Sequence, residues 1–160
     1  MKIRIFCNAM LGLLLLSASA VGSAQAVEGL AKAKPAASVG TIKVVHGEVF
    51  ILRDGKQLPA AIGSPVQVRD VVHTGPDGSV GLVLRDDTAL SLGPSSEVAL
   101  KTFTFQPNEG LFGALIGMVK GTLVYISGRI SKLAPGSVKL ETPVGIVAVR
   151  GTKLLVKIAG

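Results

Sequence analysis

The chain has 160 residues, a formal net charge of +7, 48% apolar residues, 20 glycines and only 4% aromatic residues. This length suffices for one domain with a hydrophobic core, and the composition is typical of short strands joined by turns rather than of a helix bundle. The basic residues are scattered and Trp is absent, which argues against a nucleic-acid site built from a basic stripe or stacked aromatic side chains.

The first 26 residues have the pattern of a secretory signal peptide. Lys2 and Arg4 give a basic start, an apolar stretch covers residues 9–20, and residues 24–26 (AQA) form an A-x-A cleavage site. The apolar stretch is shorter than the about 20 residues that a spanning helix needs. We therefore predict export to the periplasm with cleavage after Ala26; the alternative is an uncleaved membrane anchor.

The only cysteine of the sequence, Cys7, lies inside the predicted signal. The mature chain would then have no disulfide, thiolate ligand or thiol nucleophile. Cleavage would also lower the net charge from +7 to +5, because Lys2 and Arg4 leave with the signal. The remaining charge indicates either an ordinary solvated surface or affinity for an anionic envelope polymer.

Residues 27–39 are rich in Ala, Lys and Pro and are predicted to be a linker, followed by one β domain over residues 40–160. Strands are predicted over residues 41–46, 48–53, 66–74, 79–84, 88–92, 97–105, 121–127, 137–142 and 146–158. Their breaks and turns fall at Gly47, Asp54-Gly55, 75–78, 85–87 and Gly151. The expected fold is all-β, with short and mostly antiparallel strands in a rolled sheet, a sandwich or a β-helix-like arrangement.

Two segments depart from simple alternation. Within EVALKTFTF (97–105) the apolar parity changes midway, which predicts a one-residue bulge near Lys101 or Thr102. Residues 110–121 combine a helix-like apolar spacing with four glycines, so we expect a loop with some helical turn there.

An arginine interrupts the apolar stretch TPVGIVAVRGTK (142–153). Uninterrupted alternation would place Arg150 on an apolar face, where an unpaired charge costs several kcal/mol. Either Gly151 forms a bulge that releases Arg150 to solvent, or Arg150 binds a carboxylate bidentately. We favour the pairing, with Asp70 as first partner and Asp86 as second.

Catalytic, cofactor and metal sites are not predicted. His46 and His73 stand at strand ends without metal-ligand spacing, and the adjacent pair Asp86-Asp87 falls in a turn, where Asp is favoured by backbone hydrogen bonding. The sequence contains neither a G-x-S-x-G elbow nor a phosphate-binding loop. An enzyme would therefore lack a supported nucleophile, base or metal, and no cofactor is expected.

Several short motifs follow one another along the chain: DVVHTG (70–75), RDD (85–87), LSLGPSS (90–96) and ETPVGIVAVRGT (141–152). Their order resembles the FecR domain family over roughly residues 40–158. The matching positions are Gly63, Asp70, Thr74, Gly75, Asp86 or Asp87, Leu90, Pro94, Ser96, Thr142, Pro143, Arg150, Gly151 and Thr152. The R-G-T element that follows the TP pair is the most specific part of the match.

The resemblance implies a mostly-β extracytoplasmic domain that is not an enzyme. Well-known members span the membrane and relay a signal from an outer-membrane receptor to a cytoplasmic sigma factor. This chain has no cytoplasmic helical domain before its predicted signal, so it resembles the standalone secreted members. We expect a binding or regulatory module that contacts an envelope protein or an anionic glycan, and no nucleic acid. The alternatives are a structural envelope component without a discrete ligand and, last, a cell-wall-acting enzyme.

The final segment, residues 152–158 (TKLLVKI), is expected to be an edge strand rather than an inner one. An open edge is a template for strand addition, and Lys153 and Lys157 blunt it only in part. Such an edge would recruit a second copy, accept a partner's strand or cause aggregation.

We predict that the mature protein begins at Val27, because cleavage should follow the AQA site. N-terminal sequencing of the chain from a periplasmic fraction measures this directly. Recovery of an intact Met1 in the membrane pellet would instead favour the anchor.

Overall fold

The computed structural model describes residues 37–150 and 153–159, so the predicted signal and most of the linker lie outside the described residues, as do Gly151 and Thr152. In chain order the strands are β1 (Ser38–His46), β2 (Val49–Arg53), β3 (Lys56–Pro59), β4 (Pro65–Gln67), β5 (Val71–Thr74), β6 (Ser79–Leu84), β7 (Ala89–Leu92), β8 (Glu97–Gln106), β9 (Leu111–Ile126), β10 (Val138–Thr142), β11 (Gly145–Ala148) and β12 (Lys153–Ile158). A 3-10 turn, η1 (Pro107–Glu109), precedes β9, and a short helix, α1 (Arg129–Leu133), follows it. The first strand begins two residues before the predicted start at Gly40.

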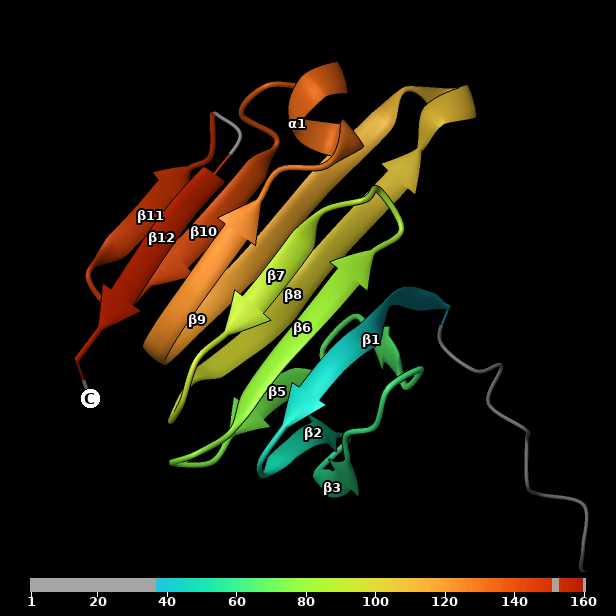
Figure 1. Cartoon of the computed structure of the whole chain (residues 1–160). Helices are drawn as coiled ribbons and strands as arrows, with labels where there is room; N and C mark the ends of the chain where they lie inside the picture. The colour runs from blue at the N-terminus through green and yellow to red at the C-terminus, as the bar shows by residue number, and fades with distance from the viewer. Residues whose placement is uncertain (1–36, 151–152, 160) are drawn as a thin grey trace, which may run out of the picture. The chain divides into compact units, whose positions relative to one another are not determined.

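The strands form one continuous sheet that curls until its two halves face each other (Figure 1). The front half contains β4, β1, β6, β7, the C-terminal part of β9, and β12, in that order. The back half contains β3, β2, β5, β8, the N-terminal part of β9, β10 and β11. Paired strands are antiparallel except for β9 and β10. The all-β prediction is confirmed, and the arrangement is the rolled sheet.

The hydrophobic core lies between the two halves and follows strand alternation. Val80, Leu82 and Leu84 of β6 are all buried, as their spacing predicts. In β8 the register shifts between Leu100 and Thr102, which confirms the predicted bulge. The bulge lets the aromatic residues of the second part of β8 pack against the same core.

The prediction of a loop with helical turn over residues 110–121 is wrong, because β9 runs through this segment. Alternate residues such as Ala114 and Ile116 are buried, so a period of two is present beneath the helix-like spacing. One of the glycines, Gly117, has a packing role in the strand. A Cβ on Gly117 would meet Cε of Lys101 at 2.9 Å, so the absence of a side chain lets Lys101 cross β9.

The single strand predicted over residues 66–74 is also wrong. β4 ends at Gln67 and β5 begins at Val71, with Arg69 between them at a φ of +74°. β4 pairs with β1 in the front half, whereas β5 pairs with β2 and β8 in the back half. The chain therefore crosses between the halves in the middle of an apparently continuous apolar pattern.

Gly121 is the bend at which β9 passes from the back half to the front half. Its φ is +93°, and a Cβ built there would overlap Ser96. Up to this residue β9 pairs with β8 and β10; beyond it β9 pairs with β7 and β12. A residue without a side chain is required both by the backbone angle and by the close approach.

Replacing Gly121 by alanine is expected to lower the free energy of unfolding by about 2–5 kcal/mol, combining left-handed strain with overpacking against Ser96. Gly110 is the matched control, because its φ is +67° but an added methyl group would meet no atom within 4 Å. Gly110→Ala should cost only the strain of about 1–2 kcal/mol. Urea denaturation measures both losses, and equal losses would show that Ser96 accommodates the methyl group.

Candidate functional site

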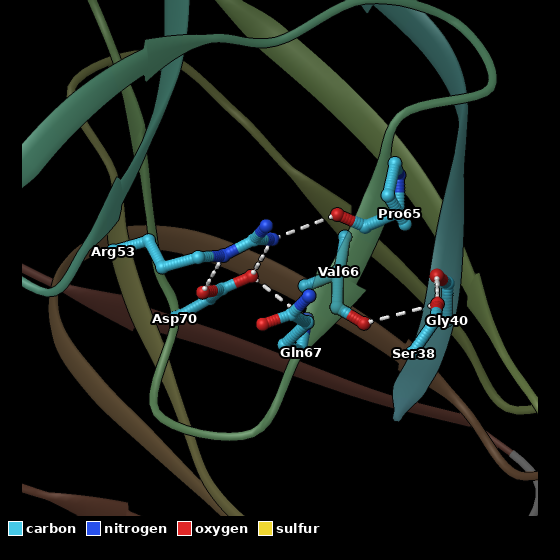
Figure 2. A network of polar contacts seen from close by, with 7 residues as sticks. All are labelled: Ser38, Gly40, Arg53, Pro65, Val66, Gln67 and Asp70. Atoms are coloured by element: carbon cyan, nitrogen blue, oxygen red, sulfur yellow. Dashed lines mark hydrogen bonds and ion pairs between the residues drawn. The ribbon is translucent and has the colours of Figure 1, made fainter. Parts of the chain in front are cut away.

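Asp70 is fully buried and organises the crossing from β4 to β5 (Figure 2). Its carboxylate accepts hydrogen bonds from Nε and Nη2 of Arg53, at 2.8 and 2.6 Å, and from the backbone N–H of Gln67 at 2.7 Å. Arg53 Nη2 also donates to the carbonyl of Pro65 at 2.9 Å. One bidentate ion pair thus ties the end of β2 to both ends of β4.

The Asp70–Arg53 pair also stabilises the protonated form of Arg53. The pKa of Arg53 lies above its ordinary value, mainly because its side chain donates hydrogen bonds to Asp70. Partial burial lowers this pKa, and the negative charge of Asp70 raises it further. A cation with a raised pKa contributes stability below its unfolded pKa and loses it as the pH rises through the folded value. This contribution is therefore present throughout the physiological range and is lost only in strong alkali.

Asp86 forms a second buried cluster, in the turn between β6 and β7. Its carboxylate accepts from the Thr88 hydroxyl at 2.7 Å, from the Thr88 N–H at 3.2 Å and from the Ile130 N–H at 3.4 Å. The Thr88 hydroxyl in turn accepts from Gly128 N–H at 3.1 Å. Asp86 therefore fastens α1 to the β6–β7 turn. The neighbouring Asp87 is exposed, which makes Asp86 the structural member of the pair.

Thr74 and Ser96 form a third buried cluster, at the crossings that follow β5 and β7. The Thr74 hydroxyl donates to the Gly93 carbonyl at 2.7 Å and accepts from Ser96 N–H at 2.8 Å. Ser96 Oγ accepts from Thr122 N–H at 2.9 Å, immediately beyond the Gly121 bend. Two small hydroxyl side chains thus connect three backbone segments across the roll.

The predicted pairing of Arg150 with Asp70 or Asp86 is wrong. Arg150 is exposed, Asp70 is occupied by Arg53, and Asp86 is held by Thr88 and α1. Arg53 has no distinguishing signal in the sequence, since it stands directly before the predicted Asp54-Gly55 turn. β11 ends at Ala148 and β12 begins at Lys153, so the predicted break falls in this interval.

Residues 70–160 match the family model described as FecR protein. The chain belongs to the FecR family. No curated protein and no solved structure matches it. Asp70, Thr74, Asp86 and Ser96 are each buried in one of the three clusters, so this part of the predicted motif stabilises the FecR fold. Family membership also supports a binding or regulatory role.

Three further motif residues, Thr142, Pro143 and Arg150, lie at one margin of this FecR-family domain, where β11 and β12 end the two halves (Figure 1). Thr142 Oγ1 donates to the Gly145 carbonyl at 2.8 Å and closes the β10–β11 hairpin. Pro143 is exposed, and the next residue, Val144, is 96% exposed at the hairpin tip. Gly151 and Thr152 lie outside the described residues.

The same margin carries other exposed apolar side chains and basic groups. Ile146 on β11 and Leu155 on β12 are each 63% exposed. A hollow of about 170 Å³ at this margin is lined by Arg150 and Lys153 together with apolar residues between Val147 and Leu154. Leu155 stands between Lys153 and Lys157 on the outer face of β12, whereas Ile146 is opposite Glu141 of β10. An exposed apolar side chain between basic groups suits the binding of an acidic partner surface better than the binding of a small molecule.

Chemistry of other kinds finds little support in the described residues. No group of three or more His, Cys, Asp or Glu side chains gathers there in a way that could hold a metal ion. His73 stacks on Phe50 with ring centroids 4.6 Å apart, and its Nδ1 lies 3.6 Å from Glu97 Oε2. Within the described part of the chain, no helix has the length and hydropathy needed to cross a membrane.

Replacing Asp70 by alanine is expected to reduce the free energy of unfolding by about 3–5 kcal/mol. The substitution breaks a buried ion pair and leaves the Arg53 guanidinium and the Gln67 N–H without their hydrogen-bond acceptor. Arg150→Ala should change it by no more than about 0.5 kcal/mol, as expected of an exposed side chain. Denaturant melts of the purified variants compare the two. A large loss for Arg150→Ala would contradict its placement at the surface.

Proposed function

We propose that this FecR-family chain is a non-enzymatic binding and regulatory module of the periplasm that contacts an envelope protein or an anionic glycan. The observation that carries the proposal is the margin formed by β11 and β12, where apolar side chains are exposed and Arg150, Lys153 and Lys157 supply basic groups beside β12. The predicted signal over residues 1–26 supports a periplasmic location, and family membership supports a regulatory role.

The buried motif residues support a binding role over an enzymatic one. Asp70 and Asp86 are the most enclosed carboxylates, yet their oxygens already accept hydrogen bonds from Arg53 and Thr88, respectively. No buried side-chain polar atom of the described residues lacks a hydrogen-bond partner. These groups are therefore committed to the fold, and the surface margin is left to provide interactions.

The basic balance of the chain supports an acidic partner. Predicted signal cleavage would leave a net charge of +5 because Lys2 and Arg4 are removed from a total of +7. Such a charge raises the rate of encounter with anionic proteins or polymers and makes binding sensitive to salt. A purely structural component would not require basic residues such as Arg150 and Lys153 beside exposed apolar side chains.

The test is crosslinking and co-purification of the tagged full-length chain from intact envelopes, with and without peptidoglycan digestion. Ile146→Asp combined with Leu155→Asp should reduce the recovered partner at least about tenfold, since desolvating two charges opposes apolar burial. The matched control is Leu58→Asp with Ile62→Asp, at exposed apolar positions of β3 and the loop that follows it.

The outcomes separate the kinds of partner. Recovery that survives digestion identifies a protein, and recovery that disappears with digestion identifies a glycan. Equal recovery with both double variants would remove the β11–β12 margin from the proposal. Absence of any specific recovery would favour a structural component without a discrete ligand.

A further inference from the structure

The two halves of the roll have unequal numbers of strands on one side of β9. On one side β7, β6, β1 and β4 are matched by β8, β5, β2 and β3. On the other side the back half continues with β10 and β11, whereas the front half continues with β12 alone. Among the described residues, the front half is therefore one strand shorter opposite β11.

Because the front half has no described strand opposite β11, inward-facing apolar surface of β11 remains exposed. Val147 of β11 is paired with Leu140 of β10, so the two side chains share the inward face. Leu140 is 1% exposed but Val147 is 45% exposed. An additional strand next to β12 would lie over β11 and bury this residue.

We propose that β12 accepts an extended acidic segment of a partner protein as an added strand, which completes the front half over β11. This deepens the proposed function and rests on it. β12 has six residues and pairs only with β9 among the described strands. Alternate residues of such an edge present both their N–H and C=O groups outward, ready to form a new ladder.

The inner face of β12 determines one side of the incoming strand. Leu154 pairs with Tyr125 and Val156 pairs with Leu123, and these two partners are fully buried. Leu154 and Val156 therefore face the core, but both remain partly exposed. Side chains of the added strand that point inward should be apolar, so that they extend the core toward Val147.

The outer face of β12 determines the charge of the incoming strand. Lys153, Leu155 and Lys157 alternate there and are all exposed. A hollow at one end of β12 is lined by Arg150 and Lys153, and one at the other end by Lys120 and Lys157, with no carboxylate side chain in either lining. The complementary strand carries an acidic, an apolar and an acidic residue at its outward positions.

Three other occupants fit less well. A second copy pairing antiparallel about Leu155 would place Lys153 opposite Lys157, and like charges directly opposite each other are unfavourable. Residues 1–36 of the chain contain one acidic residue, Glu28, and cannot supply two. An anionic lipid surface would attract the lysines but would not satisfy the outward backbone groups of β12.

The opposite margin of the roll shows how edges are blocked when no strand is to be added. β4 has only three residues and begins with Pro65, and β3 ends with Pro59. Proline and short length are both devices that prevent strand addition. β12 is longer and contains no proline, so it retains the capacity for pairing that β3 and β4 have lost.

The test uses the purified full-length chain and two capped, fluorescently labelled peptides, TEVVVET and its charge-reversed control TKVVVKT. Fluorescence anisotropy should show the acidic peptide binding at least about tenfold more tightly, with the preference weakening as salt is raised. Lys153→Glu combined with Lys157→Glu should invert the preference. Lys43→Glu combined with Lys56→Glu, at exposed positions of β1 and β3, should leave it unchanged.

Two neighbouring proline substitutions test the backbone ladder separately from the charge. Only one of Leu155→Pro and Val156→Pro removes an outward N–H, because these groups alternate along the strand. That variant should keep the thermal midpoint of the wild type and lose peptide binding, whereas the other should lower the midpoint. If both bind the acidic peptide as the wild type does, strand addition is excluded.

The remaining outcomes are decisive as well. A charge swap that fails to invert the preference, or failure of both peptides to bind, would overturn the proposal. Binding to phosphatidylglycerol vesicles without peptide binding would reassign the edge to a lipid surface.

Envelope capture separates this proposal from the proposed function. If the Lys153→Glu and Lys157→Glu double variant captures the same partner from envelopes as the wild type, the proposed function stands and the added strand is wrong. If the peptide preference holds but wild type captures nothing from envelopes, the proposed function fails alone.

Discussion

The FecR fold of this chain depends on satisfying the backbone where it crosses between the two halves of the roll. At each crossing the chain leaves one hydrogen-bonded ladder before entering the next, and buried N–H and C=O groups left unpaired there are costly. Short polar side chains replace the missing ladder partners. Asp70 accepts a hydrogen bond from the Gln67 N–H, and the Thr74 hydroxyl forms hydrogen bonds with the backbone of Gly93 and Ser96. Because these side chains are buried together with the groups they satisfy, loss of one leaves several polar groups without partners.

The same crossings explain where glycine is required. Gly47 joins β1 in the front half to β2 in the back half with a φ of +60°, and a Cβ there would lie 2.6 Å from the Asp77 carbonyl oxygen. Gly121 has the corresponding role inside β9, against Ser96. Tight crossings bring backbone from two segments close together, and only a residue without a side chain fits between them. Polar side chains and glycines are therefore two parts of one solution.

Much of the fold can be predicted from the sequence, because alternation and turn chemistry are local signals. The hairpin at Asp54-Gly55 and the bulge in β8 are examples, and both glycine and aspartate of that turn have positive φ. The strand β3 escapes prediction because Lys56–Pro59 is exposed throughout and has no apolar alternation. The crossing at Arg69 cannot be predicted locally, because strand pairing is decided by partners that are distant in the sequence: β1 for β4 and β8 for β5. Local pattern shows that a segment is extended but not which half of the roll it enters.

The wrong prediction for Arg150 has the same physical origin and bears on function. It extends alternation through a segment in which the chain leaves β11 at Ala148 and enters β12 at Lys153, so parity cannot be carried across it. Asp70 does bind an arginine bidentately, but that arginine is Arg53, which nothing in its local sequence distinguishes. With Asp70 satisfied from within the first part of the chain, Arg150 has no role in the core and stands near the start of β12, whose outer edge has no partner among the described strands. The family motif thus contains buried residues that hold the crossings, such as Asp70 and Thr74, and also Thr142, Pro143 and Arg150 at the β11–β12 margin, where the proposed partner would bind.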